Sequence, residues 1–169
     1  MLDTYLKTLD LCYFEVTEAF RDLQDENVWK RPATGLLSVG ELAGHVAYWE
    51  AVRYGGENED GSTSRDLSNC RISSPLLDPR FAYYTTTVET SPSEEHLAMT
   101  SEQVCNELLR VHLESMEFLK ARNPDLASPA PHWHSSYDEL LQYVIFHIAY
   151  HTGQMYSVRH LLGEQTPDN

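Results

Sequence analysis

The segment Phe146 to Met155, FHIAYHTGQM, places His147 and His151 four residues apart in an otherwise apolar stretch. On a helix, residues at this spacing project from the same face, about 40° from one another. A buried neutral imidazole has a donor and an acceptor to satisfy, and leaving either unpaired costs about 1–3 kcal/mol. A divalent metal ion would satisfy both rings, because each lone pair binds the ion and each N–H donates to a neighbouring oxygen. Packing alone is the other interpretation.

Two imidazoles rarely hold a metal ion tightly, so a third ligand has to come from another helix. His45 is the candidate, since it lies among apolar residues in GELAGHVAYWE. A single histidine on such a face is more often a hydrogen-bonded core residue, but its combination with His147 and His151 favours a metal site. Three neutral nitrogens suit zinc or nickel and leave a coordination position for water or substrate. The predicted metal ligands are therefore His45, His147 and His151.

The remaining histidines have simpler interpretations. His112 lies on the apolar side of the third predicted helix, where packing or a hydrogen bond is favoured over ligation. His132 and His134 belong to HWH, which follows PAP, and surface or loop packing is expected for them. His96 and His160 are predicted to be exposed.

The sequence indicates no catalytic side chain. Tyr48, Tyr143 and Tyr150 are candidates to orient a substrate, although core or interface packing is the default for this abundant residue. Glu41 lies one helical turn before His45 and is a candidate acceptor for its N–H, but a capping role already explains it. Ser-His-Asp, Cys-His and phosphate-loop patterns are missing from the sequence.

Four amphipathic segments and no convincing strand predict an all-α four-helix bundle. In the first, apolar residues recur at helical spacing. Each of the other three opens on a capping box, in which a Ser or Thr and a Glu or Gln three residues later satisfy each other's backbone amides. Gly163 is a plausible C-cap for the last helix. The predicted helices cover residues 2–23, 39–53, 101 to the proline-rich stretch after Asn123, and 137–162.

A long segment separates the second and third predicted helices. Its first part, YGGENEDGSTSRDLSNC, has the composition of a loop, and residues 71–92 are expected to be irregular with one short helical turn. Long loops in compact domains are often lids or pocket walls. We therefore expect residues 55–92 to cross the bundle and partly wall the metal pocket.

Length and charge limit the classes of function. The chain of 169 residues suits a single domain, residues 1–169, and its net charge of −14 argues against nucleic acid or an anionic membrane as partner. No apolar run approaches the roughly 20 residues of a membrane-spanning helix, and the start does not resemble a signal peptide. Three widely spaced cysteines are typical of reduced thiols, so a cytoplasmic protein is expected.

The segments SVGELAGHVAYWE and FHIAYHTGQM together resemble the DinB-like superfamily, named for DNA-damage-inducible proteins. The resemblance covers nearly the whole chain. It implies an up-up-down-down bundle with a long crossover between helices two and three, a divalent metal on His45, His147 and His151, and often a homodimer. Gly153 and Gln154 match the family's GQ, and we interpret Gly153 as permitting close helix approach.

Relatives implied by this resemblance include bacillithiol- or mycothiol-dependent transferases and thiol-dependent isomerases. A metal with an open position lowers the pKa of a bound thiol or water and produces a nucleophile at neutral pH. A thiol S-transferase using a low-molecular-weight thiol is the first hypothesis, and a hydrolase is the second. The alternative is a non-enzymatic metal- or ligand-binding bundle with a structural metal, closed by a fourth protein ligand.

Overall fold

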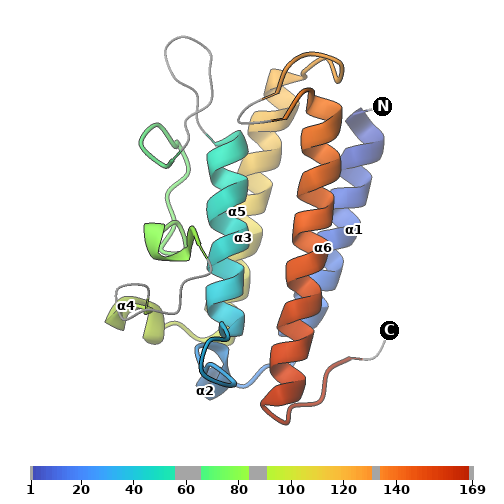
Figure 1. The fold of residues 1–169 in the computed structure, drawn as a ribbon. Helices are drawn as coiled ribbons and strands as arrows, with labels where there is room; N and C mark the ends of the chain where they lie inside the picture. The colour runs from blue at the N-terminus through green and yellow to red at the C-terminus, as the bar shows by residue number, and fades with distance from the viewer. Residues whose placement is uncertain (1, 56–65, 84–90, 131–133, 168–169) are drawn as a thin grey trace.

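The computed structural model describes residues 2–55, 66–83, 91–130 and 134–167 of the chain. Four long helices pack as a bundle and short helical segments lie in the connections, with no β-strand in these ranges, so the predicted all-α four-helix bundle is confirmed (Figure 1). The long helices are α1 (Leu2–Phe20), α3 (Val39–Tyr54), α5 (Ser101–Arg122) and α6 (Tyr137–Leu161). The short segments are α2 (Asp25–Val28), η1 (Pro79–Phe81) and α4 (Glu94–Leu97).

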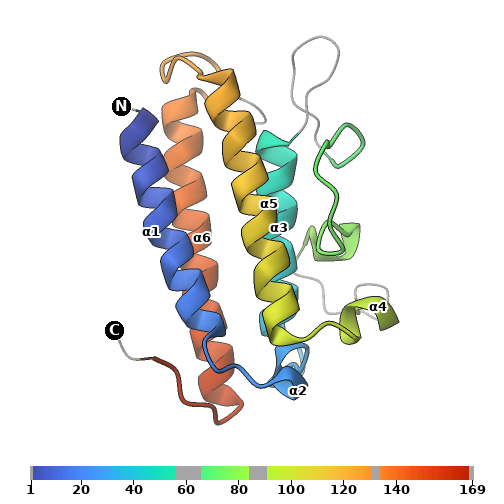
Figure 2. The ribbon, with the colours of Figure 1, turned by 180° about the vertical axis from the view of Figure 1, so that it is seen from behind.

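The directions of the helices differ from the expected order. Helices α1 and α6 run one way while α3 and α5 run the other, so the order is down-up-up-down rather than up-up-down-down (Figures 1 and 2). Side-chain contacts agree, because Tyr5 donates to Asp138 near the starts of α1 and α6, and Arg159 donates to the Ala19 carbonyl near their ends. The short link through α2 reverses the chain after α1, whereas the long crossover returns it to the end where α3 began.

Two of the three predicted capping boxes are complete. The side chains of Ser38 and Thr100 accept from the backbone N–H three residues on, and the reciprocal bonds are present. At Ser136 only half of the box forms, since the Glu139 carboxylate accepts from the N–H of Ser135 at 2.7 Å instead of from Ser136. Ser135 outcompetes Ser136 because its hydroxyl also donates to the same carboxylate.

The helix ends follow local backbone chemistry. Helix α1 ends at Phe20, earlier than predicted, and Asp22 just beyond it adopts a left-handed φ of 57°. Helix α6 ends at Leu161, and Gly163 adopts a φ of 79°, as expected for a glycine that ends a helix.

Helix α3 is buried on nearly every side, and a polar triad joins it to α1 and α5. Glu50 accepts from the Tyr13 hydroxyl and, at 2.7 Å, from Nδ1 of His112. The rings of Tyr13 and His112 stack with centroids 3.5 Å apart. Burial, and then the charge of Glu50, raise the pKa of Tyr13 well above its usual value. The prediction that His112 hydrogen-bonds rather than ligates agrees with this arrangement.

Two segments dock on α3 at glycines: the link between α1 and α3 at Gly40, and the crossover at Gly44. A Cβ on Gly40 would overlap the ring of Trp29, and a Cβ on Gly44 would overlap the ring of Phe81 in η1. These two aromatic rings lie 6.2 Å apart in a stacked arrangement. The close approach of both the α1–α3 link and the crossover to α3 therefore depends on positions without side chains.

Helix α4 is attached to the crossover through His96, which was predicted to be exposed. This residue is 3% exposed, its Nε2 lies 2.8 Å from the Pro75 carbonyl, and its ring meets Phe81 edge-on. The prediction was wrong because a short polar segment carries no sign that it folds back against another loop. His160, by contrast, is exposed as predicted.

Replacing Gly44 with Ala should lower the free energy of unfolding by about 1–3 kcal/mol, because the new methyl group overlaps Phe81. Gly153→Ala is the matched control, since Gly153 lies within α6 and a Cβ there meets nothing within 4 Å. That variant should be more stable by about 0.5–1 kcal/mol from helix propensity alone. Urea unfolding measures both, and a stabilised Gly44→Ala variant would contradict the proposed packing.

Candidate metal centre

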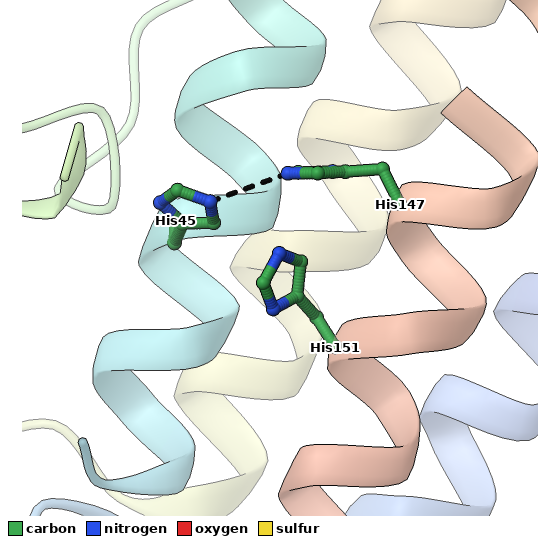
Figure 3. A group of neighbouring side chains, drawn as sticks. All are labelled: His45, His147 and His151. Atoms are coloured by element: carbon green, nitrogen blue, oxygen red, sulfur yellow. Dashed lines mark hydrogen bonds between the residues drawn. The ribbon is translucent and has the colours of Figure 1, made fainter. Parts of the chain in front are cut away.

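The three predicted histidines meet between α3 and α6. His45 comes from α3, and His147 and His151 come from α6, all with their rings directed into the same space (Figure 3). They are 6%, 7% and 2% exposed, respectively. One ring nitrogen from each lies within 4.8 Å of those of the others. The structure thus brings together residues more than 100 positions apart in the chain, while metal ligation itself stays a prediction.

Hydrogen bonds set the orientation of two of these rings. Nδ1 of His45 lies 2.8 Å from the Phe81 carbonyl oxygen, which only accepts, so the proton is on Nδ1 and Nε2 presents a lone pair. Nδ1 of His151 donates to Oε1 of Gln154 at 2.8 Å, so Nε2 of His151 also presents a lone pair. Gln154 in turn donates to the Tyr150 hydroxyl at 3.3 Å.

The sequence analysis predicted neither the Phe81 carbonyl nor Gln154 as a hydrogen-bond acceptor for these rings. The Phe81 carbonyl lies on the crossover, so no local pattern pointed to it. Gln154 had a local signal, because it follows His151 by three residues and therefore lies within reach on the helix. Gly153 does not have the role expected of it: it is exposed and has no close neighbour, so the interpretation as a helix-approach position was wrong.

The spacing of the rings fits a single divalent ion. Nε2 of His45 and Nε2 of His147 are 3.2 Å apart. Two nitrogens bound tetrahedrally at ordinary zinc distances are separated by about 3.3 Å. Without an ion, the same gap suits one hydrogen bond, with the His147 N–H donating to the lone pair of His45. A metal ion and this proton therefore compete for the same place.

Within the described ranges, no cysteine, carboxylate or fourth histidine joins this group. His112 is engaged by Glu50. His134 is 6% exposed and its ring lies 5.1 Å from that of Tyr143, so the expectation of loop packing fits and that of surface exposure does not. His132 lies outside the described residues.

Burial keeps the three imidazoles neutral. It is the largest cause that lowers the pKa of His147 to about 3 and that of His151 to about 4. The charge of Arg53 and the neighbouring His45 lower both further, and the pKa of His45 is itself lowered mainly by burial. At neutral pH the rings therefore hold the protonation state that binds metals.

A cavity of about 330 Å³ opens beside the imidazoles. The crossover forms part of its wall through Ala82 and Tyr83, and the Trp49 indole donates to the Ala82 carbonyl at 2.8 Å. The expectation that residues 55–92 partly wall the pocket is supported at these positions, while 56–65 and 84–90 lie outside the described residues. The other lining residues, besides the three histidines, come from α3 and α6: Trp49, Arg53, Tyr143, Phe146 and Tyr150.

Two of the three tyrosines named as candidates reach this cavity. Tyr143 and Tyr150 belong to its wall, and the Tyr143 ring stacks near His147 with centroids 5.9 Å apart. Tyr48 is instead buried against Val52 and Ala82, which fits the packing interpretation.

The sequence profile of the DinB superfamily matches residues 8–155, which include all of α3 and α5, most of α1 and α6, and the three histidines. The chain belongs to the DinB superfamily. Comparisons with curated proteins and with solved structures gave no match. In this family member, none of the helices in the described ranges has both the length and the apolar character needed to cross a membrane.

The low pKa values of His147 and His151 predict how the stability of the metal-free protein depends on pH. In the unfolded chain these rings have a pKa of about 6.5. Between that pH and about 4 the unfolded state therefore binds more protons, and the free energy of unfolding should fall as the pH falls. Chelator-treated protein unfolded in urea at several pH values gives this slope. His147→Leu should make it shallower and His160→Leu should leave it unchanged; a parent-like slope in His147→Leu would contradict the prediction.

Proposed function

We propose that His45, His147 and His151 hold one zinc or nickel ion, and that the protein is a metal-dependent enzyme that activates a low-molecular-weight thiol. The observation that carries the proposal is the convergence of three neutral, buried imidazoles beside an open cavity. A nitrogen donor set suits either metal. The structural-metal alternative requires a fourth protein ligand, and none is found among the residues that the structure describes.

The residues around the site would support this chemistry in distinct ways. A bound ion would supply Lewis acidity, which lowers the pKa of a thiol or of water. The Phe81 carbonyl and Gln154 hold His45 and His151 with their Nε2 lone pairs directed inward. Such supporting acceptors fix the ring orientation and increase the basicity of the ligand. Aromatic side chains line the cavity and limit the access of bulk water.

A thiol supplied by a small molecule is favoured over a thiol of the protein. The cysteines are Cys12, Cys70 and Cys105, and none belongs to the cavity wall. Burial raises the pKa of each of these thiols, which disfavours the reactive thiolate. A hydrolase, in which water takes the place of the thiol at the same site, is the second candidate. The expected homodimer and cytoplasmic location stay predictions.

Chelator should lower the melting temperature of the metal-loaded protein at pH 7.5, because the ion joins α3 to α6 and binds only the folded state. His151→Ala should remove this response and the bound ion together. His160→Ala, which changes an exposed histidine of the same helix, should respond to chelator as the parent does. Metal analysis by mass spectrometry accompanies the melting curves. One ion per chain in His151→Ala, bound as tightly as in the parent, would place the metal elsewhere.

Activity distinguishes the two enzyme hypotheses. Zinc- or nickel-loaded protein should accelerate conjugation of a small thiol to 1-chloro-2,4-dinitrobenzene, followed by absorbance. The rate should fall to that of the uncatalysed reaction in His45→Ala and after chelator treatment, since both remove the Lewis acid. Acceleration of ester hydrolysis without thiol transfer would favour the hydrolase. A metal-loaded protein without either activity, for a range of thiols and electrophiles, would favour a structural metal.

A further inference from the structure

Arg53 places a buried positive charge on the wall of the cavity. The residue is 3% exposed and lies on α3 two helical turns after His45. Its guanidinium carbon lies 5.5 Å from the ring centroid of Trp49 and 5.0 Å from that of Tyr143. Both rings also line the cavity. The guanidinium is therefore held by aromatic side chains on the same wall as the imidazoles.

Burial lowers the pKa of Arg53, and the nearby Tyr54, Tyr143 and Glu50 offset this effect only in part. Arg53 forms none of the ion pairs found within the described parts of the chain. Glu50, one turn before it, is engaged by Tyr13 and His112. Arginine stays protonated in proteins, and burying a charge without a partner is costly. An acidic protein with 26 carboxylates thus keeps, on the wall of the cavity, a cation that is ion-paired to no carboxylate of the described residues.

We propose that Arg53 binds the carboxylate of a small substrate or thiol co-substrate whose other end reaches the three-histidine site. Only the part of this inference that concerns the three-histidine site rests on the proposed function. Aromatic rings cover the guanidinium, and its planar N–H edge matches a carboxylate in a two-bond arrangement. A cavity of about 330 Å³ limits the ligand to a small molecule.

The orientation of the neighbouring rings supports a binding role. The Trp49 indole is held by the Ala82 carbonyl of the crossover, and Tyr143 lies one turn before His147 on α6. The guanidinium is therefore positioned by the same crossover and the same helix that position the imidazoles. A ligand that reaches from the Arg53 guanidinium to a metal ion on the three histidines would contact both α3 and α6.

The test compares thiols that differ only in their second group. Binding of mercaptoacetate and 3-mercaptopropionate to the zinc-loaded protein is measured by calorimetry, beside 2-mercaptoethanol and 3-mercapto-1-propanol. Each carboxylate should bind at least about tenfold more tightly than the alcohol of matching length, as a hydrogen bond to a charged group implies. Equal affinities in the parent protein would overturn the proposal without the need for any variant.

Variants of Arg53 test whether this residue causes the preference for carboxylates. Arg53→Met keeps an unbranched side chain against the rings and should lose the carboxylate preference while binding the alcohols as before. Arg53→Lys should keep a reduced preference, and it replaces the Met variant if that protein does not fold. Arg71→Met is the matched control, because Arg71 also lies over an aromatic ring, that of Phe118, but is exposed and does not line the cavity. An undiminished carboxylate preference in Arg53→Met, or in Arg53→Lys where that variant replaces it, would overturn the proposal.

A thiol-free probe separates this inference from the proposed function. Butyrate should bind the chelator-treated parent and not the chelator-treated Arg53→Met protein, because the carboxylate site does not require the ion. Such binding in a protein that takes up no metal would support the role of Arg53 while the proposed function fails. Thiols that bind the zinc-loaded protein without regard to a carboxylate, together with no butyrate binding, would leave the proposed function standing and overturn the role of Arg53.

Discussion

The hydrogen bond from His45 to the Phe81 carbonyl links the candidate metal centre to the long crossover. It fixes the proton on Nδ1, and so determines which nitrogen of His45 faces His147 and His151. It also brings the crossover close enough for Ala82 to accept from Trp49 and to form part of the cavity wall. Gly44, beside His45, permits this approach, because a Cβ at that position would overlap the ring of Phe81. The orientation of His45 and the shape of the pocket thus both depend on the contact between His45 and Phe81.

Helix α3 carries polar groups on more than one side although it is almost entirely buried. His45 faces α6, while Glu50 faces α1 and α5 through Tyr13 and His112. Each group must find its partners inside the protein, since a buried polar atom without a hydrogen bond is destabilising. The two sides are satisfied differently. Glu50 is satisfied within the bundle, whereas Nε2 of His45 and Nε2 of His151 present lone pairs to the space between the three imidazoles.

The charge of the cavity is opposite to that of the protein as a whole. The chain has a net charge of −14, yet Arg53 and the three imidazoles form a region without a carboxylate among the described residues. The charge of Arg53 helps to lower the pKa values of His147 and His151, which keeps them neutral and ready for a metal. A cavity with a divalent ion and a guanidinium would attract anionic ligands strongly, because its low-dielectric walls screen charges less than water does. Local charge, rather than net charge, therefore indicates the class of ligand.

The sequence by itself determined the four long helices, the choice of His45, His147 and His151 as the inward-facing histidines, and the family. Periodicity, capping residues and the four-residue spacing of His147 and His151 act within one helix, so they can be recognised without knowing the fold. The inward position of His45 followed from its apolar neighbours in the same way. These features hold because a helix places its side chains by local geometry alone.

Only the tertiary structure decided the helix directions, the burial of His96 and His134, and the exposure of Gly153. The same holds for the Phe81 carbonyl and for Arg53 between two aromatic rings. Each of these depends on contacts between segments far apart in the chain. No local pattern records such contacts, because the partner is chosen by how the crossover and the helices pack against one another.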